Sequence, residues 1–220
     1  MIDDSNLAEV WEQKGFSPNA QRALGIRFNS SRPGFDRAFG LALSGLANDF
    51  DVFPELYYFD DGVTPNALAS PASLFKDSDG TVLIGLSLVE ITLSEPGGEI
   101  AVFAAAAHEF AHIMAFERID SVVYRIGDLP SFVLELHADF MAGYSLFKHE
   151  EKYPTVKISK SGVLYSRLGS VSDIDPGSHG TRLMRRDALE AGYRFAESYS
   201  PLHSGRAFDA GIDRMLEIFG

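Results

Sequence analysis

A long alanine-rich run from Glu99 to Ile119, EIAVFAAAAHEFAHIMAFERI, constrains this chain more than any other segment. The run contains neither glycine nor proline, and alanine has the highest helix propensity of the common residues. Pro96, Gly97 and Gly98 stand directly before it and mark the end of the preceding structure. The run therefore predicts one long, uninterrupted helix.

Two apolar segments ahead of this helix predict strands. Leu56–Phe59 is a short strand candidate that ends at an Asp-Asp-Gly sequence. The segment TVLIGLSLVE has a β-branched start and predicts a strand over about Thr81–Leu86 that leads into a helix. The whole unit from Asn66 to Glu90 therefore fits a hairpin or a sheet edge.

Further helices are predicted from apolar residues at helical spacing and from Gly, Pro and Ser residues at the boundaries. They cover residues 6–14, 17–24, 35–50, 132–150, 162–168, 182–198 and 205–218. Ser131 is expected to cap the helix over 132–150, and a polar linker is expected over 170–178.

These elements predict a single α+β domain over residues 1–220. It is expected to be mainly helical, with a small sheet packed on the long helix. Residues 1–33 form a helical amino-terminal extension in this interpretation. Residues 66–193 form the core that carries the motifs described below.

Charge and composition exclude several functions. The chain has 31 Asp and Glu against 19 Lys and Arg, a net charge of -12. This argues against nucleic acid and anionic lipid as partners, because both are bound through clustered basic residues. The basic cluster of Arg182, Arg185 and Arg186 is interpreted as a solvated or salt-bridged helix face. The absence of cysteine excludes thiolate metal sites, so any metal must be held by His, Asp or Glu.

The start of the chain, MIDDSNLAEVWEQKG, is acidic and polar. It lacks the basic residues and the apolar stretch of a signal peptide. No segment is expected to span a membrane. A cytoplasmic location is the resulting expectation, and nothing in the sequence specifies an oligomeric state.

The sequence His-Glu-Phe-Ala-His inside the long helix brings three reactive side chains together. His108 and His112 are four residues apart, about one helical turn, so both imidazoles can reach the same ion. Glu109 lies about 100° round the helix from His108, where its carboxylate can reach a water on the metal instead of the metal itself. The pattern HExxH predicts a zinc (Zn2+) site with Glu109 as the general base.

A third ligand is expected from the predicted helix over 132–150. A catalytic zinc commonly takes three protein ligands and keeps its fourth position for water, and Glu135 supplies the third ligand. Asp139 lies on the same helix face and is expected to accept the outer ring N–H of a ligand histidine. Alanines on both helices would let the two helices approach closely.

Three other residues are weaker candidates. His179, in SHGTR, is expected either to stabilise the oxyanion or orient a substrate carbonyl, or to make a capping or structural hydrogen bond. Tyr144 is a candidate for the same electrophilic role, with core packing as the alternative. His137 lies about 200° round the helix from Glu135 and is interpreted as structural or exposed.

Taken together, HEFAH and the later ELHAD resemble the HExxH plus ExxxD pattern of the gluzincin metallopeptidases. NALASPAS, GTVLIGLSLVE and AAHEFAHIMA are similar to the catalytic core of the CAAX-prenyl-endopeptidase type. ELHADFMAGY and SHGTRLMRR are closer to the neutral zinc metallopeptidases, whose segments read E-x-x-A-D-x-x-A-G and H-G-T-x-x-x-R.

This resemblance covers residues 66–193 and implies a zincin-like fold and a peptide or protein substrate. It also implies a zinc ion held by His108, His112 and Glu135. The membrane helices of the first group and the anchor and cysteines of the second are not evident in this sequence. Membrane placement and a lipidated-peptide substrate are therefore not carried over.

The resulting hypothesis is a zinc-dependent peptidase. Zinc would lower the pKa of a water that it binds towards about 7 and polarise the scissile carbonyl, so that Glu109 can take the proton and pass it to the leaving amine. The strand over about 81–86 would pair with an extended substrate at the sheet edge. Two alternatives stay open: a catalytically silent zincin-fold module for binding or regulation, and a structural zinc site, for which no fourth ligand is evident.

Overall fold

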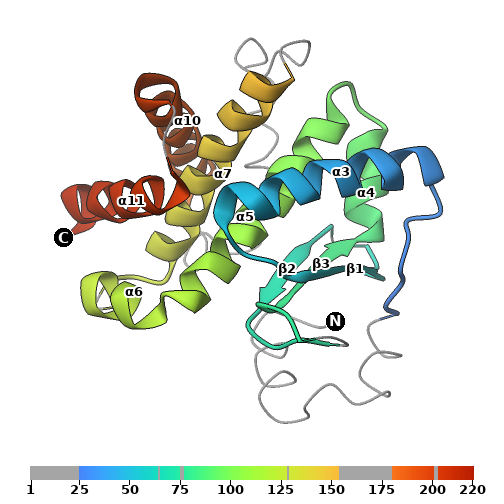
Figure 1. Ribbon diagram of the computed structural model, residues 1–220, viewed down its shortest axis with the longest axis horizontal. Coiled ribbons are helices and arrows are strands. Elements are labelled where there is room, and N and C mark those ends of the chain that lie inside the picture. Colours follow the sequence, from blue (N-terminus) through green and yellow to red (C-terminus); the bar gives the residue numbers. More distant parts are fainter. Residues whose placement is uncertain (1–24, 64, 75–76, 128, 154–179, 201–202) are drawn as a thin grey trace.

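The computed structural model describes residues 25–63, 65–74, 77–127, 129–153, 180–200 and 203–220. The elements of this part of the chain are α3 (Pro33–Phe50), β1 (Glu55–Phe59), β2 (Ala67–Ser70), β3 (Thr81–Gly85), α4 (Leu86–Leu93), α5 (Gly98–Glu117), α6 (Ile119–Ile126), α7 (Phe132–Lys152), α10 (Arg182–Tyr199) and α11 (Ser204–Phe219) (Figure 1). The predicted α+β class with a small sheet is confirmed. The helices predicted over 6–14, 17–24 and 162–168 and the linker over 170–178 lie outside the described residues.

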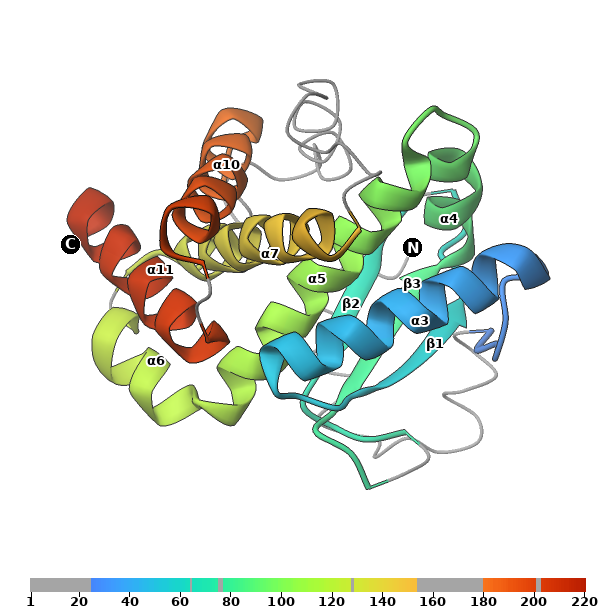
Figure 2. The same ribbon diagram turned by 45° about the horizontal axis from the view of Figure 1, so that its top comes forward.

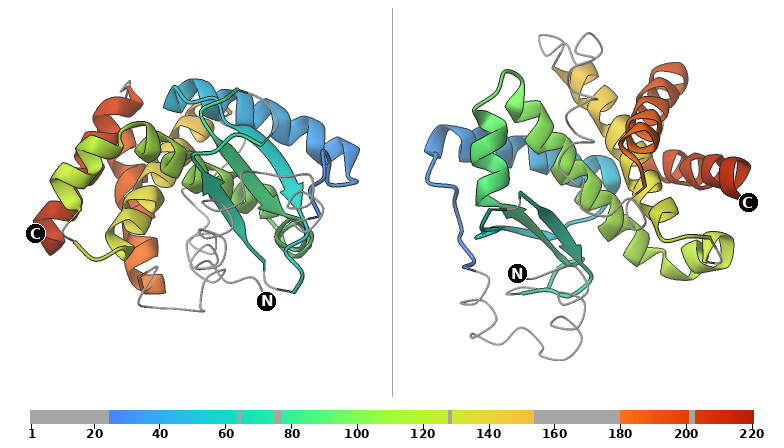
Figure 3. Two further views of the ribbon diagram at one scale, coloured as in Figure 1. Left: turned by 90° about the horizontal axis from the view of Figure 1, so that it is seen from below. Right: turned by 180° about the vertical axis from the view of Figure 1, so that it is seen from behind.

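Helix α5, the predicted long helix, lies at the centre of the fold. It packs on the sheet through β2 and β3, and on its other side it packs against α7. Helix α3 also contacts α5, and α10 and α11 lie on the far side of α7 (Figure 2). The view from behind shows α5 separating the sheet from the bundle of α7, α10 and α11 (Figure 3). The expectation that the sheet packs on this helix is confirmed.

The apolar character of α5 follows from this position. By length and composition it is the one described helix that could cross a membrane, so the expectation that no segment spans a membrane stays a prediction. However, 67% of its apolar window is buried inside the protein. A helix that is enclosed by other elements needs apolar residues all round, as a spanning helix does. Its buried apolar residues include Val102, Phe103, Ala107, Phe110, Ile113 and Met114.

Strand β3 is the central strand of the sheet, whose order is β1-β3-β2. Leu83 of β3 lies opposite Tyr57 of parallel β1 and opposite Leu68 of antiparallel β2. The expectation that the strand over 81–86 pairs with a substrate is therefore wrong, because both sides of β3 are already hydrogen-bonded to neighbours. At the outer edge of β1, Arg27 forms an isolated bridge with Tyr58. The other edge strand, β2, contacts α5.

One half-buried carboxylate joins the start of β2 to the start of α4. Asp61 accepts hydrogen bonds from the backbone N–H of Asn66 at 3.1 Å, of Ser87 at 2.7 Å and of Leu88 at 3.1 Å. The last two satisfy N–H groups in the first turn of α4, which have no partner within a helix. Gly85 is required at the junction, because an added Cβ would overlap the Asp61 carboxylate. Asp61 therefore fixes where the edge strand begins.

One additional helix and one helix cap differ from the sequence-based expectation. The chain leaves helical geometry at Arg118, with φ -117° and ψ 23°, and α6 then starts at Ile119 as a separate helix. No Gly or Pro marks this break. Ser131 does not cap α7 through its side chain: its backbone is itself helical, and the carbonyl of Pro130 accepts from the N–H of Val133 at 2.9 Å.

Helices α7 and α10 approach each other through two glycines. A Cβ added to Gly143 of α7 would overlap the carbonyl oxygen of Leu189, and one added to Gly192 of α10 would overlap the carbonyl oxygen of Phe140. The backbones are therefore in direct contact at this crossing. This close approach brings the first turns of α10 to the side of α7 that carries Asp139.

We predict that Gly192→Ala destabilises the fold, although alanine is the better helix former. Overlap with the Phe140 carbonyl should outweigh the propensity gain and lower the free energy of unfolding by about 1–3 kcal/mol. Gly40→Ala in α3 is the control, because nothing lies within 4 Å of its added Cβ; it should stabilise by about 0.4–1 kcal/mol. Urea unfolding measures both. Equal midpoints for the two variants would contradict the close contact.

Candidate metal centre

The two histidines of the HExxH sequence face the same point from one turn of α5. Their Nε2 atoms lie 3.1 Å apart, and the ring planes are inclined by 80°. Only 10% of the His108 side chain and 12% of the His112 side chain are exposed. The predicted convergence of both imidazoles is confirmed.

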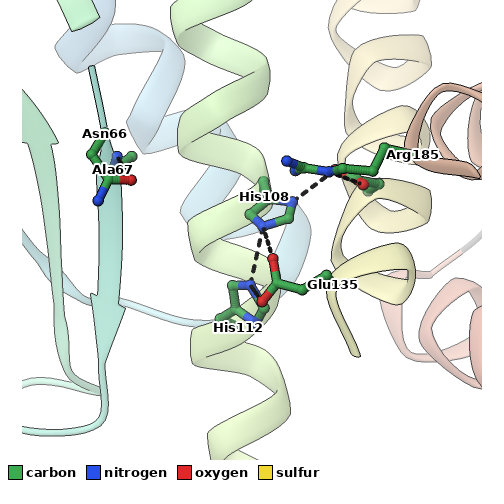
Figure 4. Close-up of polar contacts among 7 residues, drawn as sticks. Asn66, Ala67, His108, His112, Glu135 and Arg185 are labelled. Carbon is green, nitrogen blue, oxygen red and sulfur yellow. Dashed lines mark hydrogen bonds and ion pairs between the residues drawn. The ribbon is translucent and has the colours of Figure 1, made fainter. Parts of the chain in front are cut away.

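Glu135 of α7 completes a triangle of ligand atoms (Figure 4). Its Oε2 lies 3.3 Å from Nε2 of His108, and its Oε1 lies 3.4 Å from Nε2 of His112. Ligand atoms about 2.0–2.1 Å from a tetrahedral zinc ion are about 3.3–3.4 Å apart. The triangle therefore has the size of one face of such a coordination sphere, and the three residues could hold a metal ion.

Glu109 is buried beside this triangle and is not part of it. It is 8% exposed, and the ionisable groups that act on it include His108, His112 and Glu135. Burial raises the pKa of Glu109, although the neighbouring histidines oppose the shift. A carboxylate with a raised pKa is a better proton acceptor than an exposed one.

Asp139 contacts the outer nitrogen of a ligand histidine, as predicted. Its Oδ1 lies 2.9 Å from Nδ1 of His108. Burial opposes ionisation, but Arg185 and His108 hold the pKa of Asp139 below its usual value. An ionised carboxylate only accepts hydrogen bonds, so Nδ1 of His108 carries the proton and Nε2 faces Glu135. Burial lowers the pKa of His108, yet Asp139 and Glu135 raise it to about 10 in the metal-free protein.

Arg185 is the residue of this cluster whose place beside the histidines was not predicted from the sequence. It was assigned with Arg182 and Arg186 to a solvated or salt-bridged face, yet only 13% of its side chain is exposed. Its Nε donates to Oδ2 of Asp139 at 2.7 Å and its Nη2 donates to Oδ1 at 2.9 Å. The one available signal was its place as the last residue of the H-G-T-x-x-x-R segment.

The other candidates lie away from this cluster or outside the described residues. Tyr144 is about 180° round α7 from Glu135, and its ring stacks on Phe50 with centroids 6.4 Å apart, which is the core-packing alternative. His137 is fully buried, its Nε2 donates to the carbonyl of Phe208 at 3.0 Å, and burial lowers its pKa to about 4, so its structural interpretation is confirmed. His179 lies outside the described residues.

Comparison with known proteins adds no relative: no family model, no curated protein and no solved structure matches the chain significantly. The resemblance to gluzincin metallopeptidases therefore depends on the motifs and on the geometry of the centre.

We predict that metal binding releases a proton. His108 has a pKa of about 10 in the metal-free protein, so its Nε2 must lose a proton before it can bind a metal at neutral pH. About one proton should be released for each zinc ion, and the apparent affinity should rise about tenfold per pH unit between pH 6 and 8. Isothermal titration calorimetry in buffers of different ionisation enthalpy measures this release.

The control is His203→Ala, which removes an exposed histidine that caps α11 through Nδ1 and the N–H of Gly205. This variant should bind zinc with the same proton release as the unmodified protein. A binding heat that is independent of the buffer would contradict the raised pKa of His108.

Proposed function

We propose that this protein is a zinc-dependent peptidase with a zincin-like fold, in which His108, His112 and Glu135 hold the metal and Glu109 is the general base. The observation that carries the proposal is the triangle of two Nε2 atoms and one carboxylate, with separations of 3.1, 3.3 and 3.4 Å. Glu109 is buried directly beside this triangle, which supports a catalytic role for the centre over metal storage.

The ligand set favours zinc over other metals. Two imidazole nitrogens and one carboxylate are typical of zinc, whereas Ca2+ and Mg2+ prefer oxygen ligands in larger number. The group formed by the described residues has three members, which leaves a position for water. Glu135 is its most exposed member, with 20% of its side chain exposed, against 10% for His108 and 12% for His112. These features favour a catalytic site over a structural one.

The roles of the protein groups follow from their positions. Zinc, when bound, polarises the scissile carbonyl and acidifies a water molecule. Glu109 takes the proton of the attacking water and delivers it to the leaving amine, for which its raised pKa is suited. Asp139 keeps His108 in the tautomer that presents Nε2. We retain His179 as the expected partner of the oxyanion.

We infer that the substrate pairs with edge strand β2. Gly85 donates to the carbonyl of Asn66 at 2.9 Å, so residue 66 points its backbone groups at β3. Because hydrogen-bonded and non-hydrogen-bonded pairs alternate in an antiparallel ladder, Ala67 and Ala69 point theirs outward. Asn66 and Ala67 lie on the side of the two histidines opposite to α7 (Figure 4). The N–H of Ala67 donates to the Asn66 side chain at 2.9 Å, so Ala69 offers the outward N–H to a substrate.

We predict that Glu109→Gln abolishes cleavage without removing the metal. The amide cannot accept the proton, so kcat should fall by at least about 100-fold in a peptide-library digest, while zinc content is unchanged. Glu117→Gln, at the exposed end of the same helix, should leave cleavage unchanged.

A wild-type protein that binds zinc yet cleaves no peptide in broad libraries would contradict peptidase activity. That outcome would support the silent binding module instead. A chelator added to the active protein should stop cleavage, and zinc should restore it.

We predict that Ala69→Pro weakens substrate binding more than it weakens the fold. Proline is tolerated where an edge-strand N–H points outward, and one lost substrate hydrogen bond of about 1.4 kcal/mol corresponds to about a tenfold lower kcat/KM. The control is Ala69→Ser, which keeps the N–H. Equal kcat/KM for the two variants on an extended peptide would refute pairing at β2.

A further inference from the structure

The contacts of Asp139 link the metal centre to a helix that carries none of its three proposed ligands. Arg185, from the first turn of α10, holds both carboxylate oxygens of Asp139, and one of these oxygens also accepts from His108. A continuous chain of guanidinium, carboxylate and imidazole therefore runs from α10 through α7 to α5. Its three side chains are 13%, 7% and 10% exposed, respectively.

The paired geometry restrains Asp139. A two-point contact with the planar guanidinium fixes the plane of the carboxylate, which a single contact would leave free to rotate. This restraint keeps Oδ1 in position as an acceptor for Nδ1–H of His108.

We propose that Arg185 is a positioning residue that sets the metal affinity of the centre, so that docking of α10 on α7 and metal binding are coupled. The proposal rests on metal binding as proposed above and does not require peptide cleavage. Because coupling is reciprocal, a bound metal must stabilise the docked position of α10 by as much as docking strengthens metal binding.

The packing of α10 makes this coupling strong. Backbone contact at Gly143 and Gly192 leaves no space for α10 to move closer to α7. Movement in the other direction would lengthen hydrogen bonds that are now 2.7 and 2.9 Å. The docked helix therefore has one position in which Arg185 contacts Asp139 at two points.

The test compares Arg185→Gln with the neighbouring control Arg186→Gln. Arg186 is exposed and pairs with Asp187 of its own helix. Competition with a chromogenic chelator measures the zinc Kd of each purified full-length protein. Loss of the partner that orients a ligand typically costs about 10–100-fold in metal affinity, and we expect this loss for Arg185→Gln alone. Arg185→Lys keeps the charge without the two-point contact and should recover part of the affinity.

A second measurement separates positioning from a general loss of structure. Amide hydrogen exchange in α10 should become slower on zinc addition in the unmodified protein and in Arg186→Gln. In Arg185→Gln it should not respond to zinc, whereas exchange in α5 should still respond. If Arg185→Gln fails to fold, the Kd of Arg185→Lys and the zinc response of α10 in the unmodified protein decide the question.

Equal zinc Kd values for Arg185→Gln and Arg186→Gln would overturn the proposal. Amide hydrogen exchange in α10 that is unchanged by zinc in the unmodified protein would overturn it as well. A third result is distinct from these two. If the unmodified protein binds no zinc at all, then the proposed function fails, and the role of Arg185 fails with it.

Discussion

The contact between Asp139 and His108 is the interaction on which the candidate metal centre depends. Helix α5 is buried among apolar neighbours along most of its length, yet it carries two imidazoles and a carboxylate in its middle. Polar groups in such surroundings cost several kcal/mol unless they are paired. Asp139 pairs with His108 at 2.9 Å and is itself paired by Arg185. Helices α7 and α10 therefore supply the side chains that pair with the polar groups of α5, in addition to packing in the core.

The sequence predicted the part of the centre that depends on one helix at a time. Four-residue spacing is enough to bring His108 to His112, and to bring Glu135 to the face of Asp139, because the helical period is local. It did not predict Arg185, which lies 46 residues from Asp139 along the chain. Backbone contact at two glycines determines which face of α10 packs against α7. The periodicity of apolar residues in the sequence does not predict such a contact.

In the sheet, too, the local elements were predicted and their arrangement in space was not. A strand over about Thr81–Leu86 and a helix after it were predicted from the residue types, and the observed strand is Thr81–Gly85. A hairpin or a sheet edge was expected for this unit, and the structure has the hairpin with β2. Strand order was not, because β1 precedes the hairpin in the chain yet pairs with its second strand in parallel. Helix α6 was also not predicted, since neither Gly nor Pro separates it from α5.

The largely buried Arg185 also determines the net charge of the centre. Glu109, Glu135 and Asp139 are three acidic groups gathered around two histidines, and Arg185 neutralises one of them. With all three ionised and both imidazoles neutral, two negative charges remain, which is what a divalent cation cancels. Without metal, the proton that His108 retains up to about pH 10 replaces half of that missing charge. The metal-free and metal-bound forms of this interior therefore differ by one unit of charge, and the metal-free form keeps one buried negative charge more than its positive groups cancel.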